Sequence, residues 1–289
     1  MEGFAMDGAG PEAALTSAQH FRCRHCGERL DHTFIDLGMS PLCESFLTER
    51  QLGDPESYYP LHVRVCDTCW LVQLPEFVSP AHIFTEYAYF SSFSTSWVAH
   101  AGSYCELMKS RFNLPANSFI VELGSNDGYL LQYFVEQGKR VLGIEPAANV
   151  AKVAQAKGVP TRNAFFNTHT SREVVTDCGH ADLIVANNVL AQVPLLNDFV
   201  AGMAYLLAPN GVITIEVPHV QRLIAENQFD TVYHEHFSYF SLLTVETLAA
   251  RHQLKIVDVE ELPTHGGSLR VYLAHQQSHR TPSQAVDAM

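Results

Sequence analysis

The fold is decided by residues 119–128, whose sequence is FIVELGSNDG. Residues 119–123 are apolar except for Glu122 and predict a buried β-strand, and a helix is expected to begin at residues 129–131. Between them, Gly124 and Gly128 permit a close approach of the backbone to a ligand, where any side chain would clash. A glycine-containing turn between a strand and a helix therefore predicts a ligand site at the carboxyl end of that strand.

The same alternation of strand and helix continues along the chain. Further apolar strands are predicted at residues 140–144, 182–186 and 212–217, and residues 149–156 predict the helix after the first of these. Repeated βα units with apolar strands indicate a parallel sheet that helices cover on both faces. We therefore predict an α/β fold with a doubly wound, mostly parallel, Rossmann-like sheet.

Two carboxylates and one amide indicate which ligand the turn would accept. Glu145 follows the second predicted strand, where it can accept hydrogen bonds from two ribose hydroxyls, and a nicotinamide dinucleotide would suit this position equally well. The turn itself departs from the dinucleotide pattern Gly-x-Gly-x-x-Gly, because Asn126 occupies the middle glycine position. Glu122 would repel a pyrophosphate but could orient the ammonium group of an amino-acid moiety. The pattern resembles the first motif of class I S-adenosylmethionine-dependent methyltransferases.

Two Cys-x-x-Cys pairs, Cys23 with Cys26 and Cys66 with Cys69, precede this domain. Two intervening residues let both thiolates of a pair reach one tetrahedral ion, and two pairs complete a shell of four sulfurs. A redox-active Cys-x-x-Cys is the competing interpretation, but two copies in one module favour zinc. Because four sulfurs leave no position open for water, we predict a structural zinc.

Composition restricts the classes of partner. The chain carries 18 Lys and Arg against 31 Asp and Glu, a formal charge of −13, so no nucleic-acid partner is expected. No run of roughly 18 or more apolar residues occurs, so no transmembrane helix or membrane partner is expected. Residues 1–20 lack the basic start and apolar centre of a signal peptide and are expected to be disordered. Seven cysteines without a signal peptide indicate a reducing compartment, the cytoplasm.

Residues 230–239, DTVYHEHFSY, concentrate two histidines, two tyrosines and Glu235 in one short stretch. A histidine near neutral pKa beside a carboxylate is suited to proton abstraction. Taken alone, a hydrogen-bonded cluster under a loop is the more common explanation of such a stretch. A His-x-His metal pair, His234 with His236, is a third interpretation, but no third ligand is evident nearby.

Residues 87–94, YAYFSSFS, are dense in aromatic and hydroxyl side chains, and residues 97–112 show the apolar spacing of a helix. Ordinary packing between domains would account for such a segment. A lid or wall over a binding site, with phenols and hydroxyls turned toward a polar substrate, would account for it equally well.

The order of these features resembles one family. A four-cysteine module is followed by the aromatic segment, by ELGSNDG at residues 122–128, by NVLA at residues 188–191 and by YHEHFSYF at residues 233–240. Over residues 23–274 this order is similar to that of the deoxysugar C-methyltransferases, zinc-containing class I S-adenosylmethionine-dependent enzymes. The resemblance implies methylation at carbon 3 of a nucleotide-linked 4-keto-6-deoxysugar, with S-adenosylmethionine as cofactor, Zn²⁺ as structural metal and a nucleotide-sugar as the small-molecule partner.

The resemblance also implies roles for individual residues. His236 would remove the C3 proton, Tyr233 would hydrogen-bond the oxygen that becomes the enolate, Glu235 would orient an imidazole or bind substrate, and Tyr87 would supply a hydroxyl from the lid. The expected cofactor-binding residues are Glu122, Gly124, Asn126, Gly128, Glu145, Asn187 and Asn188.

We accordingly predict five segments: a disordered extension (1–20), the four-cysteine zinc-binding module (21–78), an aromatic-rich linker and helix that form a lid (79–115), an S-adenosylmethionine-binding methyltransferase domain (116–276) and a carboxyl-terminal tail (277–289).

Two features depart from the family. Gln192 stands where the family tends to carry a histidine, and an amide can hydrogen-bond a carbonyl but cannot donate a proton as an imidazolium can. Members usually continue into a further carboxyl-terminal α/β domain, which this chain is predicted to lack. Two other functions therefore stay open: an O- or N-methyltransferase of another small metabolite, and a non-catalytic protein that binds zinc and S-adenosylmethionine. The oligomeric state is not indicated.

Overall fold

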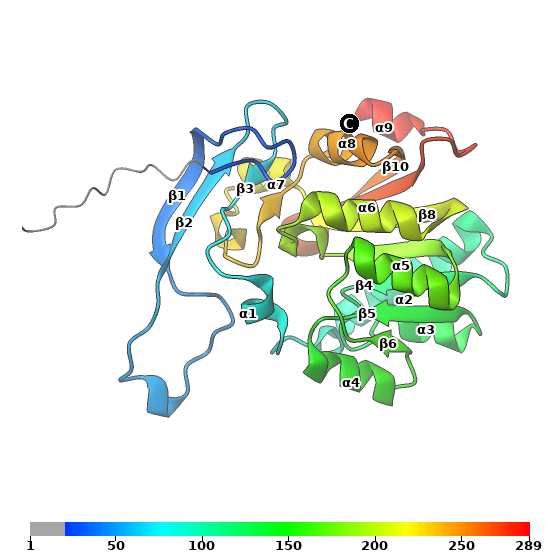
Figure 1. Cartoon of the computed structure of the whole chain (residues 1–289), viewed down its shortest axis with the longest axis horizontal. Helices are drawn as coiled ribbons and strands as arrows, with labels where there is room; N and C mark the ends of the chain where they lie inside the picture. The colour runs from blue at the N-terminus through cyan, green and yellow to red at the C-terminus, as the bar shows by residue number, and fades with distance from the viewer. Residues whose placement is uncertain (1–20) are drawn as a thin grey trace, which may run out of the picture.

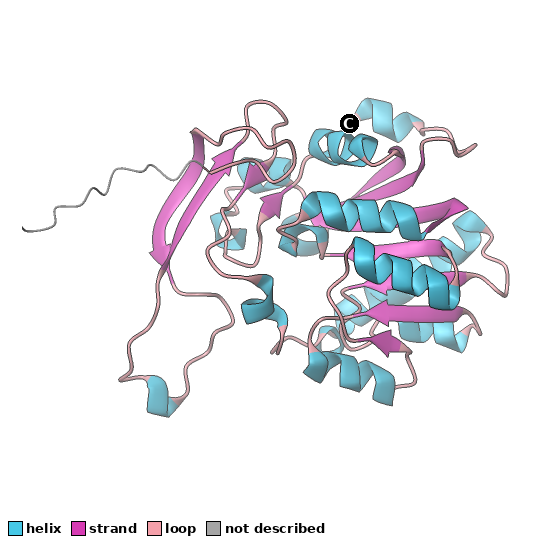
Figure 2. Cartoon of the chain, viewed as in Figure 1, coloured by secondary structure: helices cyan, strands magenta, loops and turns pink. Residues whose placement is uncertain are grey.

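The computed structural model describes residues 21–289, so the expectation of disorder for residues 1–20 lies outside the described residues. The described chain forms a seven-stranded sheet flanked by helices and a smaller four-stranded sheet beside it (Figure 2). Among residues 21–289, none of the helices has both the length and the apolar composition needed to span a bilayer.

The large sheet is doubly wound, as the sequence predicts. Its strands are β4 (Phe119–Leu123), β5 (Arg140–Ile144), β6 (Thr161–Arg162), β7 (Ala181–Asn187), β8 (Leu207–Pro218), β10 (Leu254–Leu262) and β11 (Ser268–His275), in the spatial order β10-β11-β8-β7-β4-β5-β6. The pairs formed by β4, β5, β6, β7 and β8 are parallel, and β11 is antiparallel to both of its neighbours. The sheet is therefore mostly parallel, and the order of strands reverses direction beside β4, where ligands bind in such sheets.

Helices cover both faces of this sheet. One face packs against α5 (Thr168–Cys178), α6 (Leu196–Leu206) and α8 (Leu242–Arg251), and the other packs against α2 (Thr95–Phe112), α3 (Leu131–Glu136) and α4 (Ala148–Ala156). Successive residues of β4 alternate between the two cores, Ile120 in one and Val121 in the other. Because the central strands β4 and β7 are covered on both faces, their residues are mostly apolar rather than alternating with polar ones. Two further helices are α7 (Val220–Ala225) and α9 (Gln284–Ala288).

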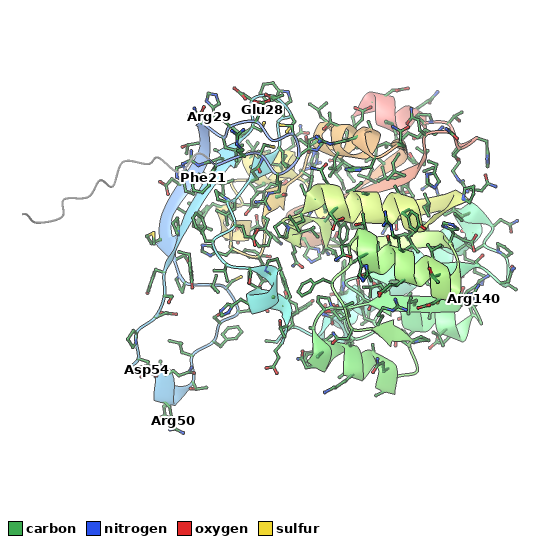
Figure 3. All side chains as sticks on the ribbon, viewed as in Figure 1. Phe21, Glu28, Arg29, Arg50, Asp54 and Arg140 are labelled. Atoms are coloured by element: carbon green, nitrogen blue, oxygen red, sulfur yellow. The ribbon has the colours of Figure 1, made fainter. Side chains whose placement is uncertain are left out.

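The smaller sheet belongs to the four-cysteine module. It is antiparallel, in the order β1 (His32–Ser40), β2 (Tyr59–Val65), β3 (Val72–Gln73) and β9 (Ser238–Tyr239). Its last strand comes from the range predicted for the methyltransferase domain, so the two predicted segments share one sheet. The short helix α1 (Pro80–Phe84) lies between this module and the helices of the large sheet (Figure 1). Arg50 and Asp54 mark the far end of the β1–β2 connection, which extends away from both sheets (Figure 3).

The turn after β4 is packed directly against β5. A Cβ built on Gly143 would lie 2.3 Å from the Ser125 Oγ and 2.9 Å from the Ser125 Cβ. Ser125 is fully buried, so its side chain cannot swing into solvent to make room. The position of the turn therefore depends on the absence of a side chain in the middle of the neighbouring strand.

The close approach of Gly143 and Ser125 predicts how substitutions at these two positions combine in their effect on stability. Gly143→Ala should destabilise the chain by about 1–3 kcal/mol, the usual cost of overpacking a core. Ser125→Gly removes the two atoms nearest to the new methyl group and leaves the Thr161 Oγ1 at 3.1 Å, so the double variant should lose less stability than the sum of the two single changes. Urea unfolding of all four proteins measures the coupling. Strict additivity would show that the turn is not held by this contact.

Candidate functional site

A cavity of about 680 Å³ opens at the carboxyl ends of the central strands. Its walls come from the turn after β4, from the ends of β5 and β7, from residues 79–97 and from the loop that contains Tyr233 and His236. Eight of the residues predicted for the site line it: Tyr87, Gly124, Asn126, Glu145, Asn187, Asn188, Tyr233 and His236. The structure thus brings groups that are up to about 150 positions apart in the sequence to a single cavity.

The part of the cavity formed by Glu145, Asn187 and the glycine turn after β4, which we call the first wall, is built around Glu145. Its Oε2 accepts a hydrogen bond from the backbone N–H of Asn126 at 2.9 Å, and its Oε1 accepts one from Ala147 at 2.8 Å. Burial raises the pKa of Glu145, while these two N–H donors act in the opposite direction. Each carboxylate oxygen keeps a lone pair free for a ligand hydroxyl.

Asn187 adds unused hydrogen-bonding capacity to the same wall. Its side chain is buried, and neither its amide oxygen nor its amide nitrogen has a partner within the described chain. Buried polar atoms are rarely left unpaired, and an unpaired one that lines a cavity is available to bind a ligand group or water there. The wall formed by Glu145, Asn187 and the glycine turn fits a polar ligand with hydroxyl and charged ends.

Three predicted site residues do not line the cavity: Glu122, Gly128 and Glu235. Glu122 is buried inside β4 with both carboxylate oxygens unpaired, and burial, together with the neighbouring Glu145, raises its pKa well above the ordinary value. Gly128 serves packing instead, because a Cβ there would lie 2.9 Å from the Val159 Cγ2 and its φ is +79°.

Gly124 lines the cavity, but its backbone also restricts substitution. Its φ is +63°, and a Cβ there would lie 2.5 Å from the Val189 Cγ2. A larger residue would therefore strain the turn before it reached any ligand.

The aromatic segment forms a wall because Asn126 and Asn149 hold it in place. The Oδ1 of Asn126 accepts a hydrogen bond from the Ser91 N–H at 2.8 Å, and its Nδ2 donates to the Tyr89 carbonyl at 3.2 Å. Asn149 makes two further bonds with the backbone of Tyr87, at 3.2 and 2.8 Å. Residues 87–91 are thereby fixed over the glycine turn, and the Tyr87 side chain lines the cavity.

The opposite wall carries a tyrosine–histidine pair. The Nδ1 of His236 lies 3.1 Å from the Thr231 carbonyl oxygen, and its Nε2 lies 3.0 Å from the Tyr233 hydroxyl. A carbonyl can only accept, so the Nδ1 carries the proton and the Nε2 accepts a hydrogen bond from the phenol. The imidazole is therefore held in one tautomer, with its basic nitrogen on the side of Tyr233.

Burial keeps this imidazole uncharged. It lowers the pKa of His236 to about 4, so the ring is neutral at pH 7 and its Nε2 lone pair is free to accept a proton. Burial likewise raises the pKa of the Tyr233 phenol above its ordinary value, and the phenol remains a hydrogen-bond donor. The pair is thus a neutral acceptor next to a neutral donor.

Glu235 forms a hydrogen bond with Tyr87 and none with His236. Its Oε2 accepts a hydrogen bond from the Tyr87 hydroxyl at 2.9 Å, and the side chain lines a smaller polar pocket behind Tyr87. Burial raises the pKa of the Glu235 carboxyl, while the hydrogen bond from Tyr87 acts in the opposite direction. The predicted role of Glu235 in orienting an imidazole thus has no contact to support it. Its neighbour His234 hydrogen-bonds the Pro60 carbonyl at 3.2 Å, and this bond gives it a structural role.

The four cysteines converge as the spacing predicts. The Sγ atoms of Cys23, Cys26, Cys66 and Cys69 all lie within 4.8 Å of one another. The closest pairs are Cys23 with Cys69 at 3.4 Å and Cys26 with Cys66 at 3.5 Å. A tetrahedral zinc with Zn–S bonds of about 2.3 Å requires sulfurs roughly 3.8 Å apart, which this cluster matches closely. The cluster fits a closed, structural zinc site.

A stacked aromatic group that sequence reasoning did not identify also lines the cavity. Trp97 lines the cavity and stacks on His100, with ring centroids 4.8 Å apart, while His265 makes a T-shaped contact with its indole ring at 5.0 Å. His100 in turn contacts the buried Glu216 at 3.1 Å, and Arg270 pairs with the same carboxylate at 2.7 Å. Spaced along a helix, Trp97 and His100 are indistinguishable from ordinary core residues.

Two family models match this chain. The model described as "Putative zinc binding domain" matches residues 23–84, and the model described as "Methyltransferase domain" matches residues 99–259, more than half of the chain. The chain belongs to the class I methyltransferase family. The order of strands in the large sheet, with β11 as its antiparallel member, is that of the family fold.

Individual proteins are similar over different lengths. The C-methyltransferase NovU of Streptomyces niveus is 37% identical over 92% of this chain, and the chain spans 64% of the length of that curated relative. Among solved structures, the magnesium protoporphyrin IX methyltransferase of Synechocystis PCC 6803 is 13% identical, with 62% of this chain and 83% of that chain covered and a TM-score of 0.49. A TehB-like methyltransferase of Corynebacterium glutamicum is 15% identical, with 61% and 98% covered and a TM-score of 0.43.

The cysteine cluster predicts one zinc per chain. Cys66→Ser should remove the metal and unfold the small sheet, because three thiolates no longer close the tetrahedron. Elemental analysis of the purified protein measures the zinc. Cys43→Ser is the matched control, since Cys43 is a free cysteine outside the cluster and should keep the full zinc content. A metal-free wild type would contradict the zinc site.

Proposed function

We propose that this chain is an S-adenosylmethionine-dependent C-methyltransferase that methylates C3 of a nucleotide-linked 4-keto-6-deoxysugar, with His236 as the base. The observation that carries the proposal is the Tyr233–His236 pair, a neutral donor hydrogen-bonded to a neutral base at 3.0 Å. It lines the same cavity as Glu145 and Asn187. The similarity to a protein described as a C-methyltransferase supports methylation at carbon.

The first wall fits S-adenosylmethionine, which supplies an electrophilic methyl group when bound. Glu145 would accept the two ribose hydroxyls on the lone pairs that its backbone donors leave free. The unpaired amide of Asn187, with Asn188 beside it, would bind the charged amino-acid end. Gly124 and Asn126 would face the ligand mainly through the backbone of the turn.

Removal of a proton beside a ketone requires a base and a donor for the developing enolate. His236 would take the C3 proton on Nε2, the nitrogen that its hydrogen bond to Thr231 leaves unprotonated. Tyr233 would transfer its hydrogen bond from that nitrogen to the sugar oxygen. One movement of the phenol would thus free the base and stabilise the enolate, which then accepts the methyl group.

Two further groups would shape the substrate side of the cavity. The Tyr87 hydroxyl, held by Glu235, would hold a sugar hydroxyl or carbonyl. Gln192 also lines the cavity and would hydrogen-bond the substrate without donating a proton in the reaction. We place the reaction in the cytoplasm, where the thiols of the zinc cluster remain reduced.

A direct assay tests the proposal. The protein, incubated with S-adenosylmethionine and a dTDP-4-keto-6-deoxysugar, should give a product heavier by one methyl group in mass spectrometry. Because the chain spans 64% of its curated relative, a version extended to the full length of that relative serves as the second test protein. If neither protein methylates the keto-deoxysugar, the proposed substrate is wrong.

Gln192 favours a second candidate, methylation of oxygen or nitrogen on another small metabolite, since a neutral amide lines the cavity where the family tends to carry a histidine. Exchange of the C3 proton for deuterium in heavy water distinguishes C-methylation from methylation of oxygen or nitrogen. Only the C-methylation route removes the C3 proton, so incorporation of deuterium at C3 would exclude the second candidate.

The base assignment predicts a large effect of one substitution. His236→Asn should lower turnover by roughly 10²- to 10⁴-fold, the range for loss of a positioned base, and should leave S-adenosylmethionine binding unchanged. Tyr233→Phe should cost less, and the double variant should be less than additive if both groups serve one proton transfer. His169→Asn, at an exposed histidine of α5, is the matched control.

The same assignment sets a pH range. The folded pKa of His236 is about 4 and the ordinary value is 6.5, so the acid limb of kcat/KM that this base causes should lie near pH 4. Between pH 4 and pH 6.5 the unfolded chain binds a proton that the folded chain does not, so the free energy of unfolding falls as the pH falls.

Near-normal turnover of His236→Asn would contradict the base assignment and would assign the proton abstraction to Tyr233 or Tyr87.

The cofactor assignment predicts a selective loss of binding. Glu145→Ala should weaken S-adenosylmethionine binding by about 1–3 kcal/mol, because it removes charged hydrogen-bond acceptors from a buried site. Titration calorimetry measures the change, with Glu136→Ala at an exposed end of α3 as the control. Equal binding of NADH and S-adenosylmethionine by the wild type would contradict the assignment.

A further inference from the structure

The zinc module and the proposed base are joined by a backbone ladder. Strand β9 begins two residues after His236 and pairs antiparallel with β3, with Gln73 opposite Ser238 and Val72 opposite Tyr239. Strand β3 begins three residues after Cys69, the last cysteine of the cluster. The loop that carries the base is therefore continuous with the fourth strand of the zinc module.

Gln73 connects the metal cluster to this ladder. Its Nε2 donates a hydrogen bond to the Sγ of Cys23 at 3.1 Å, and its Oε1 accepts one from the backbone N–H of Arg24 at 3.0 Å. The side chain is 1% exposed. Only one orientation of the amide satisfies both partners, because the thiolate needs a donor and the N–H needs an acceptor. The cluster thus fixes both the position and the rotation of this side chain.

A second set of contacts holds Phe237, the residue that follows His236. The Leu74 N–H donates to the Phe237 carbonyl at 3.0 Å, and the Phe237 N–H donates to the Ala191 carbonyl at 2.8 Å. Arg24 donates to the Leu74 carbonyl and places its guanidinium 5.4 Å from the centre of the Phe237 ring. Phe237 is therefore clamped between the zinc module on one side and the cofactor domain on the other.

The side chains of β9 add no hydrogen bond to this attachment, although the Tyr239 ring packs edge-on against His236 at 6.2 Å. The Ser238 Oγ and the Tyr239 hydroxyl are both buried without a hydrogen-bond partner in the described chain. The loop holding His236 is anchored before the base by the bonds of His234 to Pro60 and of Glu235 to Tyr87, and after the base by backbone pairing with β3 and by the clamp at Phe237. A shift of β3 would be transmitted directly to the imidazole.

We infer that Gln73 is a positioning residue, which transmits the geometry of the zinc cluster through β3 and β9 to His236. The zinc then determines the placement of the base as well as the folding of its own module. The inference rests on the proposed function only where it treats His236 as the base, since the connection itself lies in the contacts of Gln73 and Phe237.

The test uses Gln73→Met, which keeps the length and volume of the side chain and removes both hydrogen bonds. Thr33→Ala is the matched control, because it removes an exposed side-chain bond to His62 in the same sheet, far from β9. Both proteins are assayed with saturating zinc. Gln73→Met should bind S-adenosylmethionine as the wild type does and lower kcat by about 10- to 100-fold, the range for loss of a metal's outer hydrogen-bond partners. Unchanged kcat in this variant would overturn the inference.

A second measurement does not require turnover. In protein labelled with ¹³Cε1-histidine, the resonance of His236 is assigned by its disappearance in His236→Gln. Gln73→Met should shift that resonance, Thr33→Ala should leave it in place, and circular dichroism should show that the large sheet is intact in both. A resonance that stays in place in Gln73→Met overturns the inference. If the wild type methylates no keto-sugar, the proposed function fails, and this resonance still decides whether Gln73 positions His236.

Discussion

The hydrogen bonds of Asn126 hold the cavity together. Its N–H donates to Glu145, its Oδ1 accepts from Ser91, and its Nδ2 donates to Tyr89. One residue thus joins the turn after β4, the end of β5 and the aromatic wall. Its φ of +48° lies in the left-handed region, which asparagine adopts more readily than most residues. The residue that breaks the dinucleotide pattern is the one on which the geometry of the site depends.

The cavity is built from two sheets that meet at the loop containing His236. The parallel sheet supplies the strand ends that carry Glu145 and Asn187, and the antiparallel sheet ends in β9, directly after the base. The backbone of Phe237 forms hydrogen bonds with Leu74, which follows β3 of the small sheet, and with Ala191, which follows β7 of the large sheet. The placement of an acid–base group against a cofactor wall therefore depends on how one module is anchored to the other.

Much of this could be predicted from local sequence signals. The strands at residues 119–123 and 140–144 agree with the structure because short, mostly apolar runs between turns have few other solutions. The cysteines converge because their spacing already matches a tetrahedral ion. Such signals do not give the surroundings of a side chain: Glu122 precedes the turn as predicted, and the structure adds that it is buried and does not line the cavity.

The sequence by itself determined the four central parallel strands, the helices after the first two of them, the two cysteine pairs and the short list of polar groups, because each depends on residues a few positions away. Only the tertiary structure decided which of those groups share the cavity. The two-residue strand β9 has no periodicity of its own, and it forms because β3 offers it unpaired backbone groups. The tautomer of His236 is likewise set by the Thr231 carbonyl and by burial, neither of which can be inferred from the order of residues.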